Sequence, residues 1–371
     1  MQNITTLKAL KRTIIDRHVR PDNIAGFMSV TTTLVPLAVL WYAAFLSADV
    51  SYWLTASVIA VMCLFLIRVF VLMHECGHGS LFRSSRLNKV FGFAFGVVSG
   101  MPQYVWSKHH LHHHSTNGNW SKYRGPLNIV PVDEYAAMTA PQQSRYRRSR
   151  SIWLAPFAGF VYLILNPRLT WLRGSAQLVG HIVRGKIAQP GISIKAHVLT
   201  FKTPYWSSSL EYWHMFWNNV ALLSIWALMA WLVGPVLFFV CYVVSVALAG
   251  GAGILLFTVQ HNFEHSYASP NDGWDFDRAA IEGTSFLVLP RWLNWFTANI
   301  GYHHIHHLSA RIPHYCLVAC HAEYQHLFGD VTRIRFSQVP AALKCVLWDT
   351  QSRRIVSVAE YLQRSALRAA A

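Results

Sequence analysis

Long apolar stretches alternate along this chain with shorter polar and basic stretches. Four of the apolar runs can cross the roughly 30 Å hydrocarbon core of a bilayer as helices, at a rise of about 1.5 Å per residue. They cover about residues 26–47, 52–73, 212–233 and 236–259. A tight polar turn or a Gly-Pro turn separates the two members of each pair, which predicts antiparallel hairpins. The pattern therefore predicts an all-α integral membrane protein with four transmembrane helices arranged as two hairpins.

Two further apolar runs, at about 90–105 and 152–165, are shorter than a bilayer crossing requires. We expect both of them to lie at the membrane interface. The polar and charged segments should lie outside the bilayer. They divide the chain into a cytosolic N-terminal arm at 1–25, a membrane domain at 26–325 and a cytosolic, helical C-terminal tail at 326–371. The arm lacks the apolar core and small-residue cleavage site of a signal peptide.

Positive charge is distributed unevenly over the predicted topology. No Lys or Arg lies between Arg20 and Arg68, or between Lys202 and Arg278. Both hairpin turns, near Asp49 and Gly234, are therefore free of positive charge. Because basic residues concentrate on the cytoplasmic side of membrane proteins, we expect both termini to be cytoplasmic.

Composition supports a membrane protein and argues against a nucleic-acid-binding one. Charged residues make up 13% of the chain, against about 25% in ordinary globular proteins. The net charge of +16 is therefore better explained by anionic lipid head groups or an acidic partner protein, since no nucleic-acid-binding motif accompanies it. The six cysteines are scattered without a CxxC pair, which indicates a reducing compartment.

Ten histidines form four clusters at the ends of hydrophobic segments. Their spacings of i, i+3 and i+4 place the members of a cluster on one face of a helix. The clusters are His74 and His78; His110, His113 and His114; His261 and His265; and His303, His306 and His307. In the second cluster, His109, His112 and His113 have the same spacing, and spacing alone does not choose between these registers. The predicted topology brings all four clusters to the cytoplasmic side, which predicts one metal site in a cytosolic helical cap.

The chemistry of these clusters favours a pair of iron ions. Neutral imidazole binds iron, zinc, copper and nickel, and ten imidazoles exceed the needs of one ion. Cysteine is nearly absent from the clusters, unlike most structural zinc sites. Two redox-active irons fit the ligand count and react with O2. We expect polar neighbours to orient the rings, with the candidates Glu75, Glu264, Asn117, Asn262 and Asn299. His112 and His304 should face away from the metals.

The segment His74-Glu75-Cys76-Gly77-His78, with the two His-x-x-His-His motifs, resembles the three histidine boxes of integral-membrane fatty acid desaturases. Trp106, Asn117, the segment 260–265 and the segment 299–313 extend the resemblance, which covers roughly residues 26–325. In that family the spacing from Trp106 favours the register of His110, His113 and His114. The first box and Arg311-Ile312-Pro313 look most like bacterial and plastid omega-6 (delta-12) acyl-lipid desaturases.

Two positions refine this resemblance. His303 stands where front-end desaturases carry Gln, which argues against that subclass. His314 stands where the family usually has Asn, a change that we expect to leave the reaction unaltered.

The resemblance implies a cytosolic cap on four transmembrane helices, two Fe ions, O2 as co-substrate and two electrons per turnover. The ten clustered histidines would bind the metals, His261 directly or through water. The implied reaction introduces a cis double bond into an acyl-lipid chain in the bacterial inner membrane. A separate electron donor such as ferredoxin is implied, because no cytochrome-like heme motif is fused to either end.

Two alternatives remain. A hydroxylase or ketolase of the same superfamily, acting on an alkane, sterol or carotenoid, shares the first hydrogen abstraction. A histidine-lined metal transporter predicts ionisable residues within the spans, which these spans nearly lack.

Overall fold

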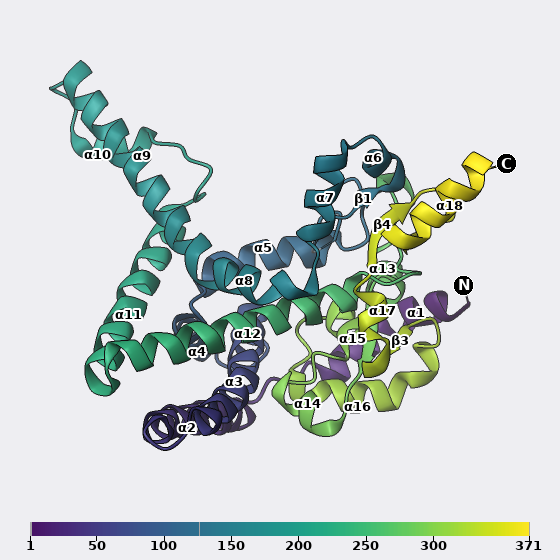
Figure 1. Ribbon diagram of the computed structural model, residues 1–371, viewed down its shortest axis with the longest axis horizontal. Coiled ribbons are helices and arrows are strands. Elements are labelled where there is room, and N and C mark those ends of the chain that lie inside the picture. The colour runs from purple at the N-terminus through teal and green to yellow at the C-terminus, as the bar shows by residue number, and fades with distance from the viewer. Residues whose placement is uncertain (1, 126, 371) are drawn as a thin grey trace.

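The computed structural model describes residues 2–125 and 127–370, which are mostly helical (Figure 1). Within this part of the chain, five helices are long and apolar enough to cross a membrane. They are α2 (Asn23–Ala48), α3 (Tyr52–His78), the continuous helix Ile152–Ala188, α11 (Ser209–Val233) and α12 (Pro235–His261). Their outer faces expose large apolar side chains, including Trp53, Trp213 and Trp231, as expected where protein meets lipid.

The four long apolar runs correspond to α2, α3, α11 and α12, and each helix is longer than its run. The side chains of Asp22 and Ser51 cap the N-termini of α2 and α3 by accepting hydrogen bonds from backbone N–H groups. At the other end, α3 continues to His78 and α12 continues to His261. These histidines therefore occupy the last turns of apolar helices, which fix their positions.

The run at 152–165 belongs to a much longer helix than the short interfacial segment expected from the sequence. The helix comprises a 3-10 turn (Ile152–Leu154), α8 (Ala155–Phe160), a π-helical turn (Val161–Leu165) and α9 (Asn166–Ala188). Helix α10 (Ile194–Thr200) folds back on it. The guanidinium of Arg168 donates hydrogen bonds to the carbonyls of Gly100 and Leu163 and to Oδ1 of Asn218. Because these hydrogen bonds satisfy the guanidinium within the protein, Arg168 does not need to face water. The helix can therefore continue past it.

The run at 90–105 is divided between two helices, α4 (Ser85–Ser99) and α5 (Gln103–Thr116). Helix α4 ends at Gly100, whose φ of 77° is a left-handed conformation that favours glycine. Pro102 then precedes the first turn of α5. The second histidine cluster therefore lies on a helix, as its spacing predicts.

A cap of short elements lies at the histidine-bearing ends of α3 and α12 (Figure 1). Its helices are α1 (Gln2–His18), α6 (Val132–Ala136), α7 (Ala140–Arg148), α13 (Phe276–Glu282), α14 (Arg291–Phe296), α15 (His303–Leu308), α16 (His314–Tyr324), α17 (Val339–Ala342) and α18 (Val358–Ala370). The N-terminal arm belongs to this cap, since Leu7 and Ile14 of α1 are buried in one apolar cluster with Leu317 of α16. Salt bridges from Lys8 to Asp275 and from Lys11 to Asp277 attach α1 to α13.

The C-terminal tail, predicted to be helical, contains strands as well as helices. Strand β3 (Thr332–Arg335) pairs in parallel with β2 (Ser285–Val288), while β4 (Cys345–Asp349) pairs with β5 (Arg354–Ser357) and with β1 (Val130–Pro131). The consecutive residues Val346, Leu347 and Trp348 of β4 are all buried, which suits a strand covered on both faces. Pairing with distant strands, rather than a local signal, makes these segments extended.

Helix α8 lies against α12 at backbone distance. A Cβ built on Gly159 would lie 2.3 Å from the carbonyl carbon of Gly250 and 2.4 Å from the amide nitrogen of Gly251. Glycine at these positions allows the two helices to approach more closely than side chains would permit. This contact places α8 directly beside the middle of α12.

Candidate metal centre

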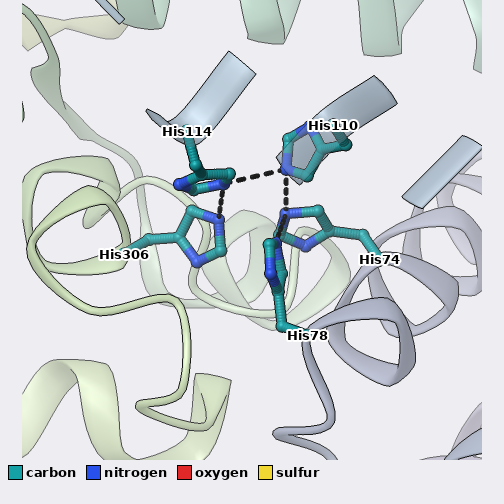
Figure 2. A group of neighbouring side chains, drawn as sticks. All are labelled: His74, His78, His110, His114 and His306. Carbon is teal, nitrogen blue, oxygen red and sulfur yellow. Dashed lines mark hydrogen bonds between the residues drawn. The ribbon is translucent and has the colours of Figure 1, made fainter. Parts of the chain in front are cut away.

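The first histidine group joins three helices. His74 and His78 come from α3, His110 and His114 from α5, and His306 from α15 (Figure 2). Each offers one ring nitrogen, and the five nitrogens all lie within 4.8 Å of one another. The group is buried except for His78, which is partly exposed.

The second group also joins three helices and is completely buried. It contains His113 of α5, His261 of α12, and His303 and His307 of α15, again with one nitrogen from each within 4.8 Å of the others. The Nε2 atoms of His303 and His261 are 2.9 Å apart, and those of His113 and His307 are 3.3 Å apart.

The His-x-x-His-His spacing divides each motif between the two groups. On α5, His113 faces the second group while His110 and His114, four residues apart, face the first. On α15 the division is reversed, since His306 faces the first group and His303 and His307 face the second. The rings of His114 and His307 stack with centroids 4.2 Å apart. The spacing therefore builds two adjoining sites from one pair of helices.

The arrangement of nitrogen atoms fits bound cations. A neutral imidazole has one N–H donor and one lone pair. Nε2 of His110 lies 2.8 Å from Nε2 of His74 and 2.9 Å from Nε2 of His114. This atom has either one proton or one lone pair, so it can form a hydrogen bond with only one of these two neighbours. Neither group contains a carboxylate or a thiolate. Lone pairs that converge in a buried space are stabilised when a metal ion accepts them.

Burial also keeps these rings in the form that binds metals. It lowers the pKa of His110, His306 and His307 well below the usual value of 6.5, and neighbouring imidazoles lower it further. The rings are therefore neutral at physiological pH, with a lone pair free for a metal ion.

His265 lies outside both groups, although its spacing from His261 matches that of His74 and His78. Its side chain is 74% exposed and lies 3.9 Å from the carboxylate of Glu264. Helix α12 ends at His261, and Asn262 has non-helical dihedrals of φ −103° and ψ 89°. The i, i+4 relation depends on continuous helix, so His265 points elsewhere.

The structure places the remaining histidines of these motifs outside the two groups. His109 and His112 are exposed, so α5 presents the register of His110, His113 and His114 to the interior. His304 is fully buried but faces the cap. Its Nε2 lies 3.1 Å from Nδ1 of His321, and its ring packs against Phe328.

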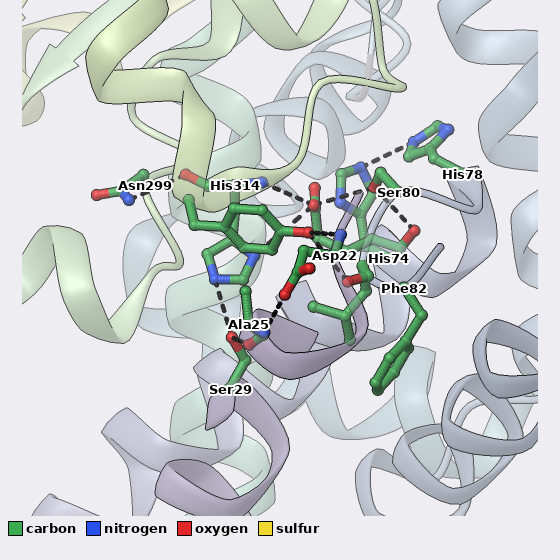
Figure 3. A network of polar contacts seen from close by, with 12 residues as sticks. Asp22, Ala25, Ser29, His74, His78, Ser80, Phe82, Asn299 and His314 are labelled. Carbon is green, nitrogen blue, oxygen red and sulfur yellow. Dashed lines mark hydrogen bonds and ion pairs between the residues drawn. The ribbon is translucent and has the colours of Figure 1, made fainter. Parts of the chain in front are cut away.

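The candidate orienting residues make contacts of several kinds. Glu75 is fully buried, but its Oε2 accepts hydrogen bonds from Ser80 Oγ and the backbone N–H of His314 rather than from a ring of either group. Asn299 donates to the carbonyl of His314, so both residues belong to the network beside His74 in Figure 3. This network attaches the start of α16 to α3.

The other three candidates follow shortly after the ends of α5 and α12. Asn117 donates to the carbonyls of Ala279 and Gly283. Asn262 is buried directly after His261. Glu264 is exposed and pairs with Arg354 of β5. These contacts position segments of the chain rather than imidazole rings.

Two contacts to the histidine rings were missed by sequence reasoning. Nδ1 of His261 faces the carbonyl oxygen of Gly283 at 3.4 Å, a partner 22 residues away that no local pattern indicates. Trp106 stacks on His110 with centroids 4.5 Å apart and planes inclined by 13°. The i, i+4 spacing of Trp106 and His110 on one helix is a signal that indicates this second contact.

A cavity of about 760 Å³ reaches both histidine groups. Its histidine wall contains His74 and His110 of the first group and His113 and His303 of the second. Most of the remaining wall is apolar and comes from α3, α12 and residues 154–163. The cavity therefore brings a largely apolar space into contact with both candidate metal positions.

These features define a membrane-helix protein with paired histidine metal sites. Comparison with known proteins agrees: the fatty acid desaturase family model matches residues 51–338. A fatty acid desaturase of Bacillus subtilis is 31% identical over 339 residues, which cover 91% of this chain and 87% of the relative.

More distant relatives have similar names. An sn-1 oleoyl-lipid 12-desaturase of Picosynechococcus is 24% identical over 308 residues, covering 80% of this chain and 77% of the relative. An endoplasmic reticulum omega-3 fatty acid desaturase of Vigna radiata is 26% identical over 272 residues, covering 71% and 63%. The chain belongs to the fatty acid desaturase family, which confirms the resemblance of its histidine boxes.

Proposed function

We propose that this protein is an acyl-lipid desaturase that introduces a cis double bond into a membrane-embedded acyl chain. The nine grouped histidines would hold two iron ions, five around one and four around the other. Bound iron would supply the O2-dependent oxidation, with two electrons delivered by a separate donor such as ferredoxin. The protein's own part is to hold the metals, exclude water and position the chain.

The cavity is the observation that carries this proposal. An apolar space of about 760 Å³ beside both groups suits a long hydrocarbon chain better than a small polar substrate. Its wall contains Phe70 and Phe257 next to the histidines, and the ring of Phe257 lies 5.0 Å from that of His113. A chain held between these aromatic rings would have a C–H bond beside the metals while its carbons remain shielded from water.

The proposed topology has four spans, α2, α3, α11 and α12, with both termini and the metal centre in the cytoplasm. A parity argument supports it. The ends of α3 and α12 share the metal centre, and the α11–α12 hairpin begins and ends on one side of the bilayer. Residues 79–208 therefore start and finish on that same side. A single crossing by the helix Ile152–Ala188 would leave Ser209 on the opposite side, so this helix packs against α12 without completing a crossing.

Cysteine labelling tests this topology. A cysteine introduced at Ser51, in the α2–α3 turn, should react with a membrane-impermeant reagent only from the periplasmic side. Reaction from the cytoplasmic side would contradict the four-span arrangement. Unmodified protein controls for labelling of the six native cysteines.

The fatty acid profile of total lipids tests the activity. Cells that express the chain should contain an unsaturated species two mass units lighter than its precursor. Cells that express the His303→Ala variant, which leaves three histidines in the smaller group, should lack it. A product heavier by one oxygen would instead identify a hydroxylase, and no new product from iron-loaded protein would contradict both activities.

A further inference from the structure

Gly253 lies in the interior of α12, a position where glycine is less favourable than alanine. Its φ is outside the left-handed region. A Cβ built on Gly253 would meet no other atom within 4 Å. Neither the backbone conformation nor the packing of neighbouring helices therefore requires glycine at this position.

The neighbouring glycines of α12 differ in this respect. A Cβ on Gly250 would lie 2.9 Å from backbone atoms of Gly159, and one on Gly251 would lie 2.8 Å from the amide nitrogen of Pro156. Close contact with α8 accounts for both residues. It does not account for Gly253.

Gly253 faces the cavity that reaches the histidines. The cavity wall contains Val246, Gly250, Gly253 and Phe257, whose spacings of four, three and four residues place them on one face of the helix. A side chain on Gly253 would therefore project into the cavity. His261 is eight residues further on, or about 12 Å along the helix axis at the usual rise per residue.

The part of the cavity near Gly253 suits the methyl end of an acyl chain. Val246 and Ala249 of α12 and Leu66 of α3 line it, and all three belong to membrane-crossing helices. Two polar wall residues, His109 and Ser149, belong instead to segments outside the long apolar helices, whereas Thr258 and Gln260 lie in α12 close to His261 and Asn166 lies in the helix Ile152–Ala188. A lipid would place its polar head near His109 and Ser149 and its hydrocarbon end toward Gly253.

We propose that Gly253 determines substrate specificity by leaving the methyl-end arm of the cavity open to long acyl chains. The proposal rests on the proposed function and adds a limit on chain length. A larger side chain at this position would close the cavity about 12 Å beyond His261, as measured along the helix. Short chains would still reach the metal centre, whereas long chains would lose space for their terminal carbons.

A substitution series in the full chain tests this role. Cells that express Gly253→Ala, Gly253→Leu or Gly253→Phe would be supplied with saturated fatty acids of increasing length, and their unsaturated products compared. We expect the ratio of long-chain to short-chain product to fall as the side chain grows, by about tenfold or more for phenylalanine, given how strongly pocket volume discriminates between hydrocarbon substrates. An unchanged ratio in folded leucine and phenylalanine variants would overturn the proposal.

Gly180 of α9 provides a matched control. It is a helical glycine with open surroundings, since its Cβ would meet only Nη2 of Arg184 at 3.9 Å, and it is not part of the cavity wall. Gly180→Leu should leave the product ratio unchanged. A similar fall in that variant would mean that bulk in any helix changes the ratio, and would also overturn the proposal.

Thiol protection separates this proposal from the proposed activity. In Gly253→Cys protein, a small apolar maleimide should label the new thiol above the background of the native cysteines. Long-chain saturated phospholipid should slow the labelling more than a short-chain analogue does. This result would support the role of Gly253 even if the wild-type protein formed no double bond, an outcome that would contradict the activity alone. Equal labelling with both lipids would contradict the role of Gly253, including when the larger variants fail to fold.

Discussion

The two histidine groups use the same helices, α5 and α15, but differ in the membrane helix that completes them. Helix α3 continues through His78 and contributes two histidines one turn apart, whereas α12 ends at His261 and contributes one. The first group therefore has five members and a partly exposed edge, and the second has four and is entirely buried. The point at which a helix ends thus sets the number of ligands that it supplies.

The largest effect should follow from His303→Ala, because it leaves three histidines in the smaller group. We expect loss of the metal ion from that position. Activity should fall well beyond the roughly 100-fold loss that follows when a residue that only hydrogen-bonds to a metal ligand is changed. Elemental analysis of purified protein should show about half the wild-type iron content. Retention of the full content would contradict the assignment of the second group.

A smaller effect should follow from His78→Ala, because four histidines remain in the first group. We expect weakened iron binding that high iron concentrations restore, with part of the activity retained. Iron titration of both variants, side by side, measures the difference. If His78→Ala lost its iron as completely as His303→Ala, the extra member of the first group would add nothing.

His304→Ala should separate stability from metal binding. This ring is fully buried and packs against both Phe328 and His321, so its removal should cost about 1–3 kcal/mol of folding free energy. Thermal unfolding should shift downward while the iron content of the folded protein remains that of the wild type. Loss of iron at a temperature where the variant is folded would place His304 among the ligands.

The pair of His304 and His321, outside the metal centre, also predicts that part of the folding stability is lost in acid. Burial lowers the pKa of His321 to about 4, below the unfolded value of about 6.5. The unfolded chain therefore binds the proton more tightly, and stability is lost as the pH falls from about 6.5 toward 4. The unfolding temperature of His321→Phe should fall less over this range than that of the wild type. Equal losses would contradict the prediction.

The smallest effect should follow from His265→Ala, since this side chain is exposed. Iron content and product should match those of the wild type within error, whereas His261→Ala should reduce both. Comparison of these two variants tests whether the end of α12 selects the ligand. Equal loss from both would mean that the helix continues to His265 when metal is bound.

Much of this arrangement could be predicted from local spacing. The apolar runs indicate the helices that end at His78 and His261, and the i, i+3 and i+4 offsets place histidines on shared faces. The position of His265 outside both groups was not predictable, because it depends on where α12 ends. That end is shaped by tertiary contacts such as the backbone hydrogen bond from Ile355 to the carbonyl of Glu264.

Other differences have the same long-range origin. The run at 152–165 was expected to be a short interfacial segment, but the helix continues past Arg168, whose guanidinium donates to Gly100 and Asn218, both distant in sequence. Glu75 was expected to orient a ring, yet adjacent helical residues differ by about 100° in direction, and it contacts His314 instead of joining His74. Strand β3 is extended because it pairs with β2. The spacing of residues along the chain does not indicate such partners, because they are distant in sequence.

The division of the histidines among the helices also orders their appearance during synthesis. Four of the five members of the first group are present once the ribosome has passed His114, whereas the second group then has only His113. The second group waits for His261 and for both of its histidines on α15, near residue 307. One metal position is therefore nearly assembled when a third of the chain has been made, and a paired centre exists only after most of the protein has left the ribosome.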